Sequence, residues 1–144
     1  MTSTTSQTIG ERQTNDVAVD PAEILSAQST EGTLSPSAWV DMQNFQRGAA
    51  VAFTDNLSVN ATLKVQLKQA TDASGTSSKN LGSEQTVEIT SGNAGTLVAD
   101  AVVGDLDIAN NFRYISAEVK LDPDSSTTAN AGALAIRADG SYRP

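Results

Sequence analysis

Residues 57–67, LSVNATLKVQL, hold the clearest pattern in the sequence, because apolar and polar residues alternate along the whole stretch. Successive side chains of a strand point to opposite faces of a sheet. The alternation therefore predicts a strand with one face in a core and the other in water. The apolar face holds Leu57, Val59, Ala61, Leu63, Val65 and Leu67, and the polar face holds Ser58, Asn60, Thr62, Lys64 and Gln66.

Shorter segments with strand character follow on both sides of this stretch. They are WVDMQNF (39–45, weakly alternating), GAAVAFTD (48–55), QTVEIT (85–90), GTLVADAVV (95–103), FRYISAEVKL (112–121) and AGALAIRAD (131–139). The first of them places Trp39, Asp41, Gln43 and Phe45 on one face. Clusters of Gly, Asn, Asp and Ser separate the segments, as expected for turns. We predict an all-β protein, an antiparallel β-sandwich or jelly roll with an extended N-terminal arm and at most one short helix.

The N-terminal residues differ from the rest of the chain. Residues 1–16 are rich in Thr, Ser and Gln and have almost nothing apolar to bury, so we interpret them as a flexible arm. This arm is either a frayed terminus or a segment that becomes ordered on a neighbouring subunit. Residues 17–144 are expected to form a single sandwich domain. Within it, residues 20–28 (DPAEILSAQ) allow either a short helix or a strand-like crossing.

The composition argues against an enzyme. The sequence has no His and no Cys, which removes the commonest general base, the thiolate nucleophile and the usual zinc and copper ligands. No serine lies in a G-x-S-x-G motif, and the carboxylates of the C-terminal half lie at strand ends or in turns, where Asp is favoured for turn geometry. We predict no catalytic residues, no metal ligands and no cofactor.

The net charge of −8 argues against a nucleic-acid partner, which requires a clustered basic surface. No apolar run approaches the roughly 18 residues of a membrane helix, so no membrane partner is expected. The first residues lack the basic and apolar regions of a secretory signal. We therefore expect a soluble protein that is synthesised in the cytoplasm.

Three segments carry a resemblance to a known family. LKVQLKQATDASG (63–75) is a strand running into a polar loop, NNFRYISAEV (110–119) is a strand with an Arg-Tyr start, and GALAIRADGSYRP (132–144) is a short terminal strand. In these segments the chain resembles the jelly-roll cement, or decoration, proteins that accompany an HK97-type major capsid protein in tailed bacteriophages. The resemblance covers about two thirds of the chain, and residues 1–46 match less well.

The resemblance implies a structural virion protein on the outer surface of a phage capsid, made in the bacterial host. Its partners would be the major capsid protein, whose neighbouring subunits it bridges, and further copies of itself, as a trimer in preference to a dimer. The polar loop 72–80, DASGTSSKN, suits such contacts because it is rich in small donors and acceptors. The expected contact residues are Ile9, Arg12, Trp39, Ser74, Gly75, Thr76, Lys79 and Tyr114.

Two alternatives stay open at this point. A neck, tail or fibre-associated phage protein could use the same sandwich. A carbohydrate-binding sandwich would need exposed aromatic rings, of which Trp39 is the leading candidate, and the Phe residues are expected in the core.

Overall fold

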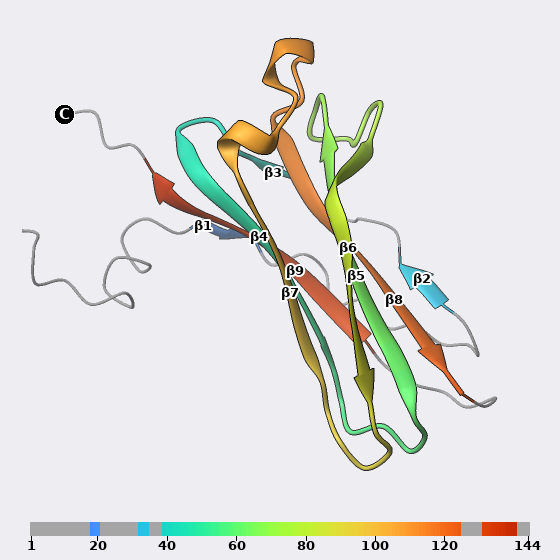
Figure 1. Ribbon diagram of the computed structural model, residues 1–144. Helices are drawn as coiled ribbons and strands as arrows, with labels where there is room; N and C mark the ends of the chain where they lie inside the picture. Colours follow the sequence, from blue (N-terminus) through green and yellow to red (C-terminus); the bar gives the residue numbers. More distant parts are fainter. Residues whose placement is uncertain (1–17, 21–31, 35–38, 125–130, 141–144) are drawn as a thin grey trace, which may run out of the picture.

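The computed structural model describes residues 18–20, 32–34, 39–124 and 131–140, which form a sandwich of two β-sheets (Figure 1). The only helical elements of this part of the chain are two 3₁₀ turns, η1 and η2, and no helix in it is long and apolar enough to cross a membrane. The elements are β1 (Ala18–Asp20), β2 (Gly32–Leu34), β3 (Val40–Asp41), β4 (Phe45–Thr54), β5 (Ala61–Ala70), β6 (Lys79–Ile89), β7 (Thr96–Val102), η1 (Val103–Asp105), η2 (Ile108–Asn110), β8 (Tyr114–Pro123) and β9 (Ala131–Gly140).

The strand order is that of a jelly roll. One sheet has the order β1-β9-β4-β7, and the other has β2-β8-β5-β6, with β3 pairing with β8 as well. All these pairings are antiparallel. If β2 and β3 count as one interrupted strand, consecutive strands alternate between the sheets up to β5, as in two nested Greek keys. The prediction of an all-β jelly-roll sandwich is confirmed.

The two sheets contribute side chains of very different size to the core. In the β2-β8-β5-β6 sheet, the inward residues are large, namely Leu63, Val65 and Leu67 of β5 and Ile115, Val119 and Leu121 of β8. In the β1-β9-β4-β7 sheet, the buried inward residues are alanines, namely Ala50 and Ala52 of β4, Ala99 of β7, and Ala131, Ala133 and Ala135 of β9. Large side chains on one sheet thus pack onto a small-residue surface on the other.

The strand predicted at 57–67 begins later than expected, at Ala61. Leu57 is nevertheless buried, because the connection from β4 is hydrogen-bonded to the β6–β7 turn. Leu57 N donates to Asn93 O (3.0 Å), and Gly92 N donates to Leu57 O (2.7 Å). Leu57 therefore extends the alternating pattern in the sequence although it lies in a connection and forms no strand pair in β5.

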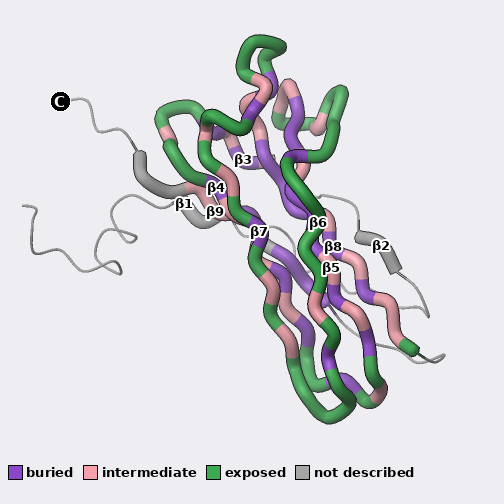
Figure 2. The backbone as a smooth tube through the Cα atoms, in the orientation of Figure 1, coloured by how far each residue is buried: buried purple, intermediate pink, exposed green. Residues whose placement is uncertain are grey.

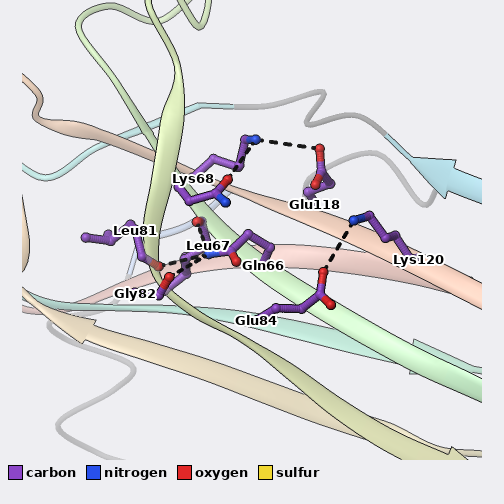
Figure 3. A network of polar contacts seen from close by, with 9 residues as sticks. Gln66, Leu67, Lys68, Leu81, Gly82, Glu84, Glu118 and Lys120 are labelled. Atoms are coloured by element: carbon purple, nitrogen blue, oxygen red, sulfur yellow. Dashed lines mark hydrogen bonds and ion pairs between the residues drawn. The ribbon is translucent and has the colours of Figure 1, made fainter.

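The expected outward position of Gln66 in water is wrong, since this side chain is only 5% exposed. The β5–β6 register shifts between Val65 and Leu67, so β6 bulges opposite Gln66. The Gln66 amide fills the bulge, donating to Leu81 O (3.1 Å), Gly82 O (3.2 Å) and Leu67 O (2.8 Å) (Figure 3). The amide thus joins β5 to Leu81 and Gly82 of β6 at the point where the register shifts.

The weakly alternating segment 39–45, for which no inner face was predicted, contributes two residues to the core. Val40 and Met42 are buried in the core, and a turn at Gln43 and Asn44 separates β3 from β4. In β4 the inward set is Ala50 and Ala52, so Phe53 is only half-buried on the opposite face, although a core position was expected. The helix-or-strand alternative for residues 20–28 and the arm at 1–16 lie outside the described residues.

We predict that Gln66→Ala lowers the free energy of unfolding by about 1–3 kcal/mol, because it removes the buried hydrogen bonds that the Gln66 amide makes at the bulge. The matched control is Gln85→Ala, an exposed glutamine on β6 whose bond is local, to Ser83 O. The control should stay within about 0.5 kcal/mol of the parent. Urea unfolding of both variants measures the difference. Equal stabilities would mean that the Gln66 amide does not hold the bulge.

Candidate interaction surface

Three connections meet at one end of the sandwich. They are the β3–β4 turn (42–44), the β5–β6 loop (71–78) and the β7–β8 connection (103–113), which lie at the top of Figure 1. We call them together the loop end. Met42 N donates to Arg113 O (2.8 Å), and Asp107 N donates to Gln69 Oε1 (2.9 Å), so strand ends and connections are linked.

The β5–β6 loop is folded around the carboxylate of Asp72. Asp72 Oδ1 accepts hydrogen bonds from Ser74 N (2.9 Å) and Thr76 N (3.1 Å), and Asp72 O accepts one from Gly75 N (3.1 Å). Hydrogen bonds from Thr76, from its side chain first, hold the pKa of Asp72 below its ordinary value of 3.8. A loop of small polar residues thereby has a defined shape while Ser74 and Thr76 stay exposed.

Trp39 supports this loop from below. An added Cβ on Gly75 would lie 2.5 Å from Trp39 Nε1 and 2.7 Å from Trp39 Cε2, so the indole lies directly against the Gly75 backbone. The backbone φ of Gly75 is +80°, which an L residue rarely adopts. Position 75 therefore requires glycine for both reasons, and half-buried Trp39 acts as a platform for the loop.

The β7–β8 connection is folded around Asp107 in a similar way. The carboxylate of Asp107 accepts from Lys79 Nζ and from Asn110 Nδ2 (2.9 and 3.0 Å). Hydrogen bonds from Lys79 first, and from Asn110, lower its pKa. Lys79 Nζ also lies 4.0 Å from the centroid of the Phe112 ring, a cation–π contact that fixes the lysine at the start of β6.

A third polar cluster lies where β3, β8 and β9 meet. Arg113 Nη2 is 3.0 Å from Asp41 Oδ2 and donates to the Tyr114 hydroxyl (3.2 Å). Arg137 Nη1 donates to Asp41 O (2.6 Å), and its guanidinium lies 4.4 Å from the centroid of the Phe45 ring. The end of β3 is therefore fixed by two arginines, Arg113 from the β7–β8 connection and Arg137 from β9.

The structure gathers most of the predicted contact residues at the loop end. Trp39 lies against Gly75, and Ser74 and Thr76 are the neighbours of Gly75 in the loop. Lys79 pairs with Asp107, and the Tyr114 hydroxyl accepts a hydrogen bond from Arg113. Ile9 and Arg12 lie outside the described residues. Whether any of these residues contacts a partner stays a prediction.

Sequence reasoning missed the pairing of Asp41 with Arg113, which lies 72 positions away. It identified Asp107 as a turn carboxylate but did not predict Lys79 as its partner. It also missed the exposed valines of β7, Val98 and Val102. A sequence signal exists for these valines. In GTLVADAVV, Val98 and Val102 alternate with Thr96 and Asp100 on the face opposite Leu97, so the face expected to be polar is half apolar.

Three carboxylates of the C-terminal half have structural partners, and Asp100, expected at a strand end or in a turn, lies within β7. Asp107 binds Lys79, Asp122 lies 2.8 Å from Lys64 Nζ, and Asp105 accepts from Val102 N (3.0 Å). Within the described ranges, no group of three or more metal-ligating side chains is placed to hold an ion. The loop end is suited to contact by shape and hydrogen bonding.

Comparison with known proteins supports the fold. No family model matches the chain, and no curated protein matches its sequence. Among solved structures, a chain of infectious bursal disease virus, Gx strain, superposes with a TM-score of 0.51 at 15% identity, over 89% of this chain and 34% of that one. A chain of T=1 particles derived from infectious bursal virus gives a TM-score of 0.50 at 17% identity, over 86% and 32%.

A weaker likeness, to cowpea mosaic virus empty particles, has a TM-score of 0.41 at 11% identity, over 85% of this chain and 80% of that one, and carries no argument. This protein spans about a third of the length of the bursal disease virus chains. At these identities the likeness shows the fold alone: the sandwich is a jelly roll of the kind found in virus particles.

We predict that Gly75→Ala destabilises the protein more than Gly92→Ala does. Both glycines have a positive φ, +80° and +87°, so both variants carry backbone strain of about 1–2 kcal/mol. Only at position 75 would the new Cβ meet Trp39, which adds about 1–3 kcal/mol of overpacking or displaces the ring. Thermal unfolding measures the difference. The emission of Trp39, the single tryptophan, should shift to the red in Gly75→Ala only.

The lowered pKa of Asp72 gives a pH prediction. Because its folded-state pKa lies below 3.8, the ionised carboxylate stabilises the loop above that pH, and the contribution is lost as the pH falls through the folded value. In an NMR titration, the Ser74 and Thr76 amide signals should move together with a midpoint below 3.8. Asp72→Asn should abolish this transition. A midpoint at or above 3.8 would show that the carboxylate does not accept these bonds.

Proposed function

We propose that this protein is a structural component of a virion, and specifically a capsid cement or decoration protein of a tailed bacteriophage. It would bind the outer capsid surface and bridge neighbouring major capsid protein subunits. The observation that carries the proposal is the rigid polar loop end on a jelly-roll sandwich. The viral jelly-roll fold and the resemblance of residues 63–75, 110–119 and 132–144 support it.

The way the loop end is built fits attachment to a preformed shell. The Asp72 and Asp107 hydrogen bonds and the Trp39–Gly75 contact hold the exposed loop residues in place before any partner binds. Preordering of this kind reduces the entropy lost on binding. Ser74 and Ser78 then offer hydroxyl groups to a polar surface, which suits contact across the junction between subunits.

The stabilising mechanism would be avidity. One protein that contacts two capsid subunits, or an oligomer that contacts several, makes the later contacts intramolecular. Weak individual contacts then hold the shell against internal DNA pressure. The surrounding sandwich serves as a rigid spacer between contact points.

The geometry is less suited to a carbohydrate-binding site on Trp39. A sugar ring stacks on a free aromatic face, whereas the indole here is half-buried and lies against the Gly75 backbone. A neck or tail protein would present the same fold but would be present at about a dozen copies per particle, against hundreds for a cement protein. Copy number therefore separates these two readings.

Binding to undecorated phage capsids tests the proposal. Wild-type protein should saturate the capsids at hundreds of copies and raise their temperature of DNA release. Ser74→Arg adds bulk and charge to the exposed β5–β6 loop and should lower occupancy at least tenfold. The control Ala94→Arg makes the same addition to the β6–β7 turn at the opposite end, and should bind as wild type.

Occupancy is measured by density gradient and gel densitometry after circular dichroism has shown that both variants are folded. Absence of wild-type binding to capsids would contradict the cement role. Equal loss in both variants would contradict the assignment of the loop end as the contact surface.

A further inference from the structure

The outer faces of the two sheets differ in chemistry. On the β2-β8-β5-β6 sheet, the outer face carries ion pairs between strands. Lys64 and Asp122 lie 2.8 Å apart, and Figure 3 shows Lys120–Glu84 at 3.3 Å and Lys68–Glu118 at 3.8 Å. The outer face of the other sheet carries Ala49, Val51 and Phe53 of β4, with Val98 and Ile136 in register beside them. The first face is suited to water, and the second is largely apolar.

The exposed part of this apolar surface is concentrated at β7. Among the described residues, the large apolar side chains that are most exposed are Val98 (53%), Ile108 (50%) and Val102 (48%), all from β7 and the connection after it. Along β7 the exposed residues alternate, at Thr96, Val98, Asp100 and Val102 (Figure 2). Exposed valines on one strand are a feature that solvent alone does not favour.

The backbone of β7 is also open on one side. β7 is the last strand of its sheet, after β4. Thr54 N donates to Gly95 O (2.9 Å), so Gly95 faces β4, and by alternation Leu97, Ala99 and Ala101 face β4 as well. The N–H and C=O groups of Thr96, Val98 and Asp100 therefore point away from the sheet. Beyond them, the Val102 N–H is bonded to Asp105 Oδ2 (3.0 Å), which ends the open stretch.

The edge strand of the other sheet, β6, is protected against pairing. It is bulged at Gly82 opposite Gln66 and carries exposed Lys79, Glu84 and Glu88. Bulges and charges of this kind prevent a second strand from adding to an edge. β7 has no bulge against β4, no proline, no lysine and a single charged residue, Asp100. The β6 edge is thus protected against the addition of a strand, whereas the β7 edge is open to it.

We propose that β7 is the site of a two-fold contact between copies of this chain, in which β7 pairs antiparallel with β7 of the second copy. The partner is a second copy of this chain, because the open β7 edge with its exposed valines needs another open edge of the same kind, and β7 of a second copy provides one. A two-fold makes the same edge serve on both sides. The two β1-β9-β4-β7 sheets then form one continuous sheet.

Charge selects the register of the pairing. A two-fold centred on Val98 places Val98 opposite its own mate and Asp100 opposite Thr96 of the second copy, so each carboxylate faces a hydroxyl. A two-fold centred on Asp100 would place two carboxylates face to face, which is destabilising. The Val98-centred register also pairs the open N–H and C=O groups of Thr96, Val98 and Asp100.

This contact goes beyond the proposed cement function and does not depend on it. It leaves the loop end free, because the pairing uses the side of the sandwich. The paired stretch Thr96–Asp100, about 17 Å long, forms a small interface, so dimers should be populated only at high protein concentration. Since each copy carries a net charge of −8, association should strengthen when salt screens the repulsion.

Analytical ultracentrifugation of the full chain at 0.15 and 0.5 M salt tests the contact. Wild-type protein should be dimeric at high concentration, and Val98→Lys should weaken association at least tenfold. The control Thr86→Lys makes the same charge change on the exposed face of the protected edge β6 and should associate as wild type. A wild-type protein that stays monomeric at both salt concentrations overturns the proposal, as does equal association of the two variants.

Hydrogen exchange distinguishes edge pairing from packing of the apolar faces against each other. In the dimer, the amides of Val98 and Asp100 should be protected relative to dilute wild-type protein, and the protection should be lost in Val98→Lys. A dimer in which these two amides exchange as fast as in the monomer overturns edge pairing. Unchanged circular dichroism and melting temperature of both variants exclude a folding defect, which half-exposed Val98 is not expected to cause.

Discussion

The packing of large side chains on one sheet against alanines on the other is the constraint on which the rest of this structure depends. Leu63, Leu67, Ile115 and Leu121 fill the space between sheets, and Ala50, Ala52, Ala133 and Ala135 leave room for them. Side chains from two packed sheets share a layer about 10 Å thick, and the alanines leave the space that these large residues occupy. In the alanine sheet, Val51, Phe53 and Val98 lie on the outer face, whereas Leu97 is partly buried against the core. The sheet that completes the core therefore also carries an apolar surface outside it.

The loop end follows from the rigidity of this core. Strands that are fixed by packing end at fixed points, and the loops between them are then held by a few polar residues, Asp72, Asp107 and Asp41. The close contact between Trp39 and Gly75 depends on the core and on the loop hydrogen bonds. The core holds Val40, the neighbour of Trp39, and the Asp72 turn positions Gly75. Binding surfaces of this type owe their shape to the scaffold beneath them.

The two proposed surfaces use different parts of the molecule and different chemistry. The loop end is polar and preordered, which suits a capsid surface, and the β7 edge is apolar with open backbone groups, which suits a second copy. Together they would allow a chain to contact a shell and a neighbouring copy at once, which is the arrangement that avidity requires. The ion-paired outer face of β5 and β8 would remain in solvent.

Local pattern in the sequence determined the class of fold and much of the core. The alternation in residues 61–67 and 115–121 identified the inward residues of β5 and β8 correctly, because a strand with one wet face shows its periodicity directly. The jelly-roll order, the position of the bulge at Gln66 and the ion pairs of Asp41 and Asp107 were decided only by the tertiary structure. They depend on residues far apart in the chain, such as Asp41 with Arg113 and Gln66 with Leu81. The alanine-rich strands β4, β7 and β9 carry apolar residues on both faces, so the sequence alone did not show which face is buried. The tertiary structure shows that the alanine face packs against the large residues of the opposite sheet.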